Sequence, residues 1–185
     1  ARAGAGVVLC GRNAEEAESL NATRRSPHLP GAVFPPAVTA RADAAALPAA
    51  ERIERADRVI RYKSAKYSVE HPLLIGATTG GLDDAGVEAL SRYGLDLGRA
   101  FQLRDDLLGV FGDPQETGKP AGDDLREGKR TVLLAHALAG LDAGGQARVE
   151  SLVGRADLDA SQVEELRATI VGSGAVARLE DEITR

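Results

Sequence analysis

The chain has 185 residues, of which 43% are hydrophobic and 28% charged. These proportions are typical of one medium-sized globular domain and exclude disorder along most of the length. The net charge of −5 argues against nucleic acid or an anionic membrane as a partner. The single cysteine, Cys10, excludes an intrachain disulfide and indicates a reducing compartment, the cytoplasm.

With three Tyr, three Phe and no Trp, the core must be built from Ala, Leu, Val and Ile, which favours helices. No apolar run is long enough to span a membrane, and no segment shows the alternation of a strand. The predicted fold class is therefore all-α. The sequence contains no Met, even at its first position, so we expect a processed product or a fragment of a longer chain.

Residues 1–50 are predicted to be an atypical leader that is loop-rich or poorly ordered. Four prolines lie between Pro27 and Pro36 and prevent a long helix there. Residues 26–50 are interpreted as a loop or a poorly ordered tail. Residues 51–185 are predicted to form the helical domain.

The helical domain opens with a charged, partly amphipathic helix over 51–70, which Pro72 is expected to stop. A second helix is predicted to begin at Asp83 or Asp84, both good N-cap residues, and to end near Phe111. Its core-facing stripe is predicted to consist of Val87, Leu90, Leu97, Phe101, Leu108 and Phe111.

A polar, Gly-rich loop is predicted over 112–130, and a short buried helix over 131–139. Near the end of the chain, the stretch 161–164 (Ser-Gln-Val-Glu) has the pattern of a capping box. It predicts the start of one more amphipathic helix, with Val163, Leu166 and Ile170 on its apolar face.

Polar and acidic positions gather on one face of the predicted helix that ends near Phe111. This face spans roughly 100° around the helix axis and contains Gln102, Asp105, Asp106, Gly109 and Asp113. The loop that follows brings Lys119 and Lys129 close to these acids. Carboxylates for a hard cation and lysines for phosphate oxygens are what a magnesium–diphosphate site needs. A solvated surface has the same composition, and the spacing alone does not separate the two interpretations.

A second candidate is the pair Lys63 and Lys66, which lie on neighbouring positions of the predicted helix 51–70. Both could face one anion. Two exposed lysines on a charged helix explain the same pattern, and the spacing alone favours that explanation.

Together, three segments resemble the trans-isoprenyl diphosphate synthases, the polyprenyl synthetase family. Phe101-Gln-x-x-Asp-Asp is similar to the second aspartate-rich motif of the family, and Lys63-Ser-x-x-Tyr67 to its Lys-Thr-x-x-Tyr element. The stretch from Gly118 to Thr131 is similar to the loop after that motif. The resemblance covers about residues 51–140 and implies the carboxyl-terminal part of an isoprenoid-synthase helical bundle.

The resemblance implies that Asp105 is a magnesium ligand and that Asp106 supports or shares the metal. It implies catalytic roles for Lys63, Gln102 and Asp105. The diphosphate of an allylic substrate would be contacted by Lys63, Ser64, Gln102, Lys119 and Lys129. In the family, this diphosphate leaves an allylic carbocation, the double bond of isopentenyl diphosphate attacks it, and loss of a proton completes the step.

The chain departs from the family pattern at three points. Gly109 stands where many members have a third Asp, and Asp113 is one candidate replacement. Ser64 replaces the usual Thr and keeps the hydroxyl. The first aspartate-rich motif is absent, and the loose echo of it over 15–25 is interpreted as chance because its acids are Glu and it lies too close to Lys63.

The leading prediction is a prenyltransferase whose activity is impaired by the lack of the first motif. The alternative is a non-catalytic subunit that binds diphosphate or packs against a complete synthase. The family resemblance also implies a homodimer. A terpene cyclase is a third reading, but it would not need the loop from Lys119 to Thr131. An acidic motif encoded upstream of Ala1 would favour the enzyme.

Overall fold

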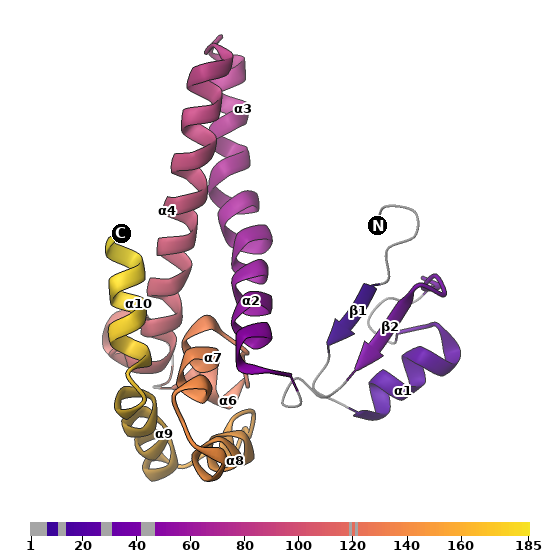
Figure 1. The fold of residues 1–185 in the computed structure, drawn as a ribbon, viewed down its shortest axis with the longest axis vertical. Coiled ribbons are helices and arrows are strands. Elements are labelled where there is room, and N and C mark those ends of the chain that lie inside the picture. The colour runs from indigo at the N-terminus through magenta and orange to yellow at the C-terminus, as the bar shows by residue number, and fades with distance from the viewer. Residues whose placement is uncertain (1–6, 11–13, 27–30, 42–46, 119, 121) are drawn as a thin grey trace. The chain divides into compact units, whose positions relative to one another are not determined.

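The structure is a computed structural model that describes residues 7–10, 14–26, 31–41, 47–118, 120 and 122–185. The chain divides into two compact units, Ala1–Pro48 and Ala49–Arg185. Both are drawn in Figure 1.

The described residues of the first unit form the strands β1 (Val7–Cys10) and β2 (Val38–Arg41) and the helix α1 (Ala14–Thr23). The strands pair in parallel, with Val7 opposite Val38 and Cys10 opposite Arg41. The Asn21 side chain ties α1 to β2, because its amide donates to the Ala40 carbonyl (2.8 Å) and accepts from the Ala40 N–H (2.7 Å).

The loop predicted over 26–50 is therefore wrong in part, since β2 lies within it and a helix begins at Ala49. The prediction that no segment forms a strand is also wrong for this unit. A strand of four residues is too short to show alternation, and a parallel pair joins segments far apart in the sequence. Local pattern carries little information about such pairing.

Where the structure describes the second unit, all of its regular elements are helices, which confirms the all-α prediction. Its helices are α2 (Ala49–Val59), η1 (Ile60–Glu70), α3 (His71–Thr79), α4 (Asp84–Phe111), α5 (Pro114–Thr117), α6 (Asp123–Arg126), α7 (Val132–Ala139), α8 (Ala143–Leu152), α9 (Ala160–Gly172) and α10 (Ala175–Thr184). In the described ranges, none of the helices combines the length and apolar character needed to cross a bilayer.

The helices α2, η1 and α3 follow one another without a break, so the predicted stop at Pro72 is wrong. The segment η1 is π-helical, and the N–H of His71 bonds to the carbonyl of Lys66, five residues earlier. Proline disrupts an α-helix because its ring collides with the carbonyl four residues earlier and it has no N–H. At Pro72 the chain enters a new first turn of α3, where a missing N–H is tolerated.

Helix α4 has the bounds that the sequence predicts. Asp83 is its N-cap, and the carboxylate accepts a hydrogen bond from the Gly86 N–H (2.9 Å). The helix ends at Phe111, next to the extended residue Gly112. It lies beside η1 and α3, and together they form the long pair of rods in Figure 1.

The predicted core-facing stripe of α4 is wrong for three of its residues. Leu97, Phe101 and Leu108 are 44%, 67% and 45% exposed. The side chains that α4 buries in the core are instead Leu103, Leu107 and Val110. Periodicity favoured the first set because it counts apolar side chains, whereas the helix packs against η1 through glycines, which add no apolar signal.

Two glycines of α4 bring it close to η1. A Cβ at Gly98 would lie 2.5 Å from the Cα of Ala65, and one at Gly94 would lie 2.9 Å from the Cα of Glu70. At the same interface, the Ser91 hydroxyl donates to the buried Glu70 carboxylate (2.5 Å) and lowers the pKa of that carboxyl. The two rods therefore meet backbone to backbone.

Helix α7 is a short buried helix, as predicted for 131–139, and belongs to the hydrophobic core. Thr131 caps it by accepting from the Leu134 N–H (3.2 Å). Six of its side chains are buried, namely Val132, Leu133, Leu134, Ala135, Ala137 and Leu138. Arg99 adds a polar tie around this core, because it bonds both Asp57 of α2 and Glu182 of α10 at 2.6 Å.

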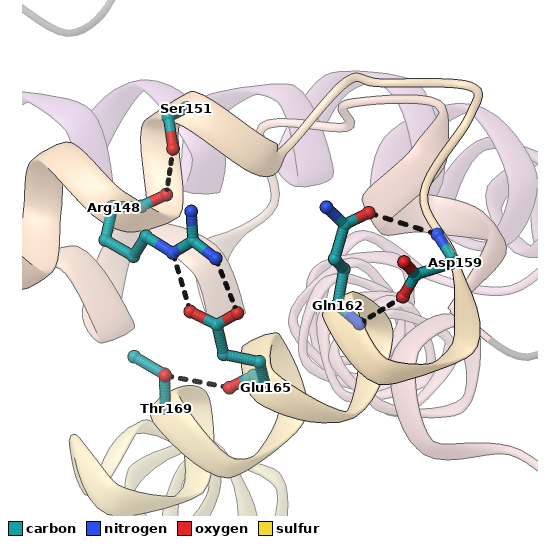
Figure 2. Close-up of polar contacts among 6 residues, drawn as sticks. All are labelled: Arg148, Ser151, Asp159, Gln162, Glu165 and Thr169. Carbon is teal, nitrogen blue, oxygen red and sulfur yellow. Dashed lines mark hydrogen bonds and ion pairs between the residues drawn. The ribbon is translucent and has the colours of Figure 1, made fainter.

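The capping box of α9 lies two residues earlier than the sequence predicts. Asp159 accepts from the Gln162 N–H (2.8 Å), and the Gln162 side chain accepts from the Asp159 N–H (3.1 Å), as Figure 2 shows. The predicted apolar face is confirmed, because Val163, Leu166 and Ile170 are all buried. Arg148 of α8 and Glu165 of α9 form a bidentate ion pair, with both N–O distances at 2.7 Å.

A matched pair of glycine substitutions tests the contact between η1 and α4. Gly98→Ala is expected to lower the free energy of unfolding by about 1–3 kcal/mol, because its methyl group meets the Ala65 backbone. Gly76→Ala in α3 has open space around it and is expected to raise it by about 0.5–1 kcal/mol. Urea denaturation measures both, and equal effects would contradict the close approach.

Candidate functional site

Four of the predicted site residues are joined by hydrogen bonds across the contact between η1 and α4. The Ser64 hydroxyl donates to Oε1 of Gln102 at 2.5 Å. Nε2 of Gln102 donates to Oδ2 of Asp105 and to Oδ1 of Asp106, both at 3.0 Å. The Lys-Thr-x-x-Tyr-like element and the aspartate-rich segment therefore lie side by side in the fold.

Asp106 is the buried member of the acid pair, with 5% of its surface exposed. Burial raises the pKa of its carboxyl to about 6, and the nearby charges of Asp124 and Asp105 act in the same direction. Hydrogen bonds from Gln102 and from the Val132 backbone oppose this rise. The carboxylate is therefore held in a place that disfavours its negative charge.

Asp124 is a third acid of this cluster, and it was not among the predicted site residues. It is buried in α6, and its carboxylate is paired with the Lys129 ammonium. Lys129 also contacts Glu127 at 3.1 Å. The pKa of Lys129 is raised, mainly because its ammonium donates a hydrogen bond to Asp124. The signal available in the sequence was the pair Asp123–Asp124 between two glycines of the loop.

The position of Asp124 explains the glycine at 109. A Cβ at Gly109 would overlap the Asp124 carboxylate, so no other residue fits there without a local shift. Asp113, the candidate replacement, instead caps α5 by accepting from the Gln115 N–H (2.8 Å). The acid that occupies the space beside Gly109 thus comes from α6.

A cavity of about 360 Å³ opens beside these residues. Four acids contribute to its lining, namely Asp105, Glu116, Asp123 and Asp124, together with Leu108 and Gly109. Four carboxylates around one cavity attract positive charge, either as a metal ion or as a cationic side chain such as Lys129, which pairs with Asp124.

The remaining predicted residues have different surroundings. Lys63 is exposed and directly precedes Ser64 in η1. Lys66 pairs with Glu70 at 3.1 Å, so the idea that it shares an anion with Lys63 is not supported by the structure. Lys119 lies outside the described residues.

Oxygen donors such as those of the acid cluster are the ligands that Mg²⁺ prefers. Within the part of the chain that the structure describes, no group of three or more His, Cys, Asp or Glu is arranged to hold a metal. Mg²⁺ does not require one, since it commonly takes one or two carboxylates together with substrate phosphates and water. Asp105 and Asp106 offer hard oxygen donors, and both accept hydrogen bonds from the neutral amide of Gln102, so they fit that mode.

Comparison with known proteins identifies the family. The polyprenyl synthetase family matches residues 41–170 of this chain, so the chain belongs to that family. A geranylgeranyl diphosphate synthase from Mycobacterium tuberculosis is 40% identical over 111 residues, which are 58% of this chain and 32% of that protein. A geranylfarnesyl diphosphate synthase from Natronomonas pharaonis is 45% identical over 97 residues, 52% of this chain and 26% of that protein.

Solved structures agree on the fold. The crystal structure of a geranylgeranyl pyrophosphate synthase from Corynebacterium glutamicum, complexed with isoprenyl diphosphate and magnesium, is 45% identical and superimposes with a TM-score of 0.68. The match covers 71% of this chain and 38% of that one. The chain therefore spans about a third of the length of the relatives that it matches.

The pKa of Asp106 predicts an unusual dependence of stability on pH. Because this pKa is raised from 3.8 to about 6, the folded chain binds more protons than the unfolded chain between these values. The contribution of Asp106 to the free energy of unfolding should therefore fall as pH rises from 4 to 6, by at most about 3 kcal/mol. Asp106→Asn should remove this slope and raise stability at pH 7.5. Asp105→Asn should reduce the slope only in part, because the charge of Asp105 raises the pKa of Asp106 less than burial does. Urea denaturation across this pH range measures both.

A double-mutant cycle tests the overlap between positions 109 and 124. Gly109→Ala is expected to cost about 1–3 kcal/mol of unfolding free energy, because its methyl group meets the Asp124 carboxylate. In the Asp124→Ala background the same change should cost clearly less, which gives a coupling of at least about 0.5 kcal/mol. Additive effects in thermal or urea unfolding would show that the two positions do not compete for space.

Proposed function

We propose that this chain forms part of a prenyltransferase that condenses an allylic prenyl diphosphate with isopentenyl diphosphate to make a longer prenyl diphosphate. The observation that carries the proposal is the hydrogen-bonded set of Ser64, Gln102, Asp105 and Asp106 in a chain of this family. The names of the relatives, which are geranylgeranyl and geranylfarnesyl diphosphate synthases, support the substrate class. The proposed setting is the cytoplasm, in keeping with the single cysteine.

In this proposal, Asp105 and Asp106 hold Mg²⁺, the cofactor. When bound, the metal supplies positive charge that stabilises a departing diphosphate. Lys63, Lys119 and Lys129 contact the diphosphate of the allylic substrate. Lys63 is exposed and can reach an anion in solvent, whereas the Lys129 ammonium would have to exchange Asp124 and Glu127 for phosphate oxygens.

The apolar side chains next to the acids suit the hydrocarbon part of such a substrate. Phe101 and Leu108 precede and follow Asp105 by about one turn of α4, and both are exposed. An allylic cation that forms here when the C–O bond to diphosphate breaks must be shielded from water until the double bond of isopentenyl diphosphate attacks it. Apolar surface beside the carboxylates provides one wall of a water-poor site.

A second candidate function is a non-catalytic subunit that binds diphosphate or packs against a complete synthase or a second copy. The observation in its favour is the same exposed apolar face, which includes Leu97 and Phe101. Surfaces of this kind are typical of positions that another chain covers. The homodimer implied by the family resemblance belongs to this proposal.

The test is incorporation of labelled isopentenyl diphosphate into farnesyl diphosphate by this chain with Mg²⁺. We expect slow product formation by the parent chain, because the first aspartate-rich motif is not found in it, and a further loss of at least 100-fold in the double variant Asp105→Asn, Asp106→Asn. Losing both carboxylates removes several kcal/mol of transition-state stabilisation. Asn is chosen because it keeps the volume of the buried Asp106. Asp96→Asn, an exposed acid on the same helix, is the matched control and should retain activity.

The absence of product distinguishes the two candidate functions when diphosphate binding is measured alongside. Titration calorimetry with inorganic diphosphate and Mg²⁺ should show binding to the parent chain and not to the double variant. Binding without product would support the non-catalytic subunit. Neither binding nor product would contradict both.

A further inference from the structure

The side-chain amide of Gln102 forms hydrogen bonds with the protein through its oxygen and through both of its N–H groups. Its oxygen accepts from the Ser64 hydroxyl at 2.5 Å. Its nitrogen carries two N–H groups, and the two are taken up by Asp105 and Asp106, each at 3.0 Å. In this arrangement the amide has no N–H left to donate to a diphosphate.

The orientation of this amide is determined from both ends. If the amide were rotated by 180°, its oxygen would face two carboxylates, which have only acceptors, and both interactions would become repulsive. The Ser64 hydroxyl then stabilises the correct orientation by donating to the oxygen on the other side. Ser64 comes from η1 and Gln102 from α4, so the packing of the rods fixes the amide.

The amide is also suitable because it is neutral. A lysine or arginine between Asp105 and Asp106 would cancel their charge and compete with a cation for the same oxygens. Gln102 instead donates from one nitrogen to both carboxylates and does not neutralise their negative charge. Each carboxylate retains one oxygen that does not bond this amide.

We propose that Gln102 is a positioning residue that holds Asp105 and Asp106 convergent for a divalent cation, and that Ser64 acts one step further out by fixing Gln102. This inference rests on the proposed function, because it takes Asp105 and Asp106 as the carboxylates that hold the metal. It differs from the roles that the family resemblance implies, in which Ser64 and Gln102 contact the diphosphate directly. Hydrogen bonds that orient metal-binding side chains commonly affect metal affinity by 10-fold or more.

The experiment is a titration of the full chain with Mn²⁺ alone, followed by electron paramagnetic resonance of the free ion, without any diphosphate. Ser64→Ala and Gln102→Leu are expected to raise the dissociation constant for Mn²⁺ by about 10-fold. Ser64→Thr keeps the hydroxyl and should stay within about twofold of the parent chain.

Ser91→Ala is the matched control, because it also removes a hydroxyl that bonds a carboxylate across η1 and α4, but at Glu70. It should leave Mn²⁺ binding unchanged, which separates positioning of the acid pair from general loosening of the interface. If Ser91→Ala weakened Mn²⁺ binding as much as Ser64→Ala, the effect would be structural and the inference would be wrong.

Two further outcomes would overturn the inference in different ways. If Ser64→Ala and Gln102→Leu bind Mn²⁺ like the parent and lose only inorganic diphosphate binding, the two residues contact the diphosphate and the metal assignment stands. If the parent binds Mn²⁺ no better than Asp105→Asn, Asp106→Asn does, the metal assignment itself fails, and the positioning role fails with it.

Discussion

The close contact between η1 and α4 at Ala65 and Gly98 is the constraint on which the candidate site depends. Because Gly98 has no side chain, the two backbones approach until a methyl group no longer fits between them. Ser64 is next to Ala65 in sequence, and Gln102 is one turn beyond Gly98. At a wider separation the Ser64 hydroxyl would not reach the Gln102 amide. The hydrogen bonds that lead from Ser64 to the acids therefore require this close packing.

The electrostatics of the site run against stability, and the rest of the second unit offsets this cost. Burial raises the pKa of Asp106 to about 6, and the charges of Asp124 and Asp105 act in the same direction. The lysine at 129 compensates Asp124, but the acid pair on α4 bonds a neutral amide. The apolar core around α7 can support this cost, because a few kcal/mol is small beside the burial of many Leu and Val side chains. Strain of this kind is typical of binding sites.

Some of the fold could be predicted because local chemistry determines it. Asp83 and Thr131 are caps, and α4 and α7 begin where these residues indicate. The buried face of α4 could not be predicted from periodicity, since Gly94 and Gly98 make the contact without any apolar side chain. Continuation of the helix through Pro72 depends on the π-helical turns before it, which leave no clear mark in the sequence.

The site shows the same division between local and tertiary information. Residue type and spacing on one helix singled out Gln102, Asp105 and Asp106 as candidates. Ser64 was assigned only through the resemblance of its segment to a family motif. Asp124 was missed because the path of a Gly-rich loop decides where it lies, and that path depends on tertiary contacts. Gly109 indicates that another group occupies the space beside it, but the sequence does not show that this group is the Asp124 carboxylate.

Exposed apolar residues lie beside the acids on α4, so binding of a cation to the acids is coupled to burial of these apolar residues. Phe101 is 67% exposed and lies one turn before Asp105. Any group that covers Phe101 and Leu108, whether a prenyl tail or a helix of another chain, also removes water from the neighbouring carboxylates. Removing water from a charge is unfavourable unless an opposite charge replaces it. A bound cation would supply that charge, so cation binding and coverage of the apolar face each favour the other by linkage.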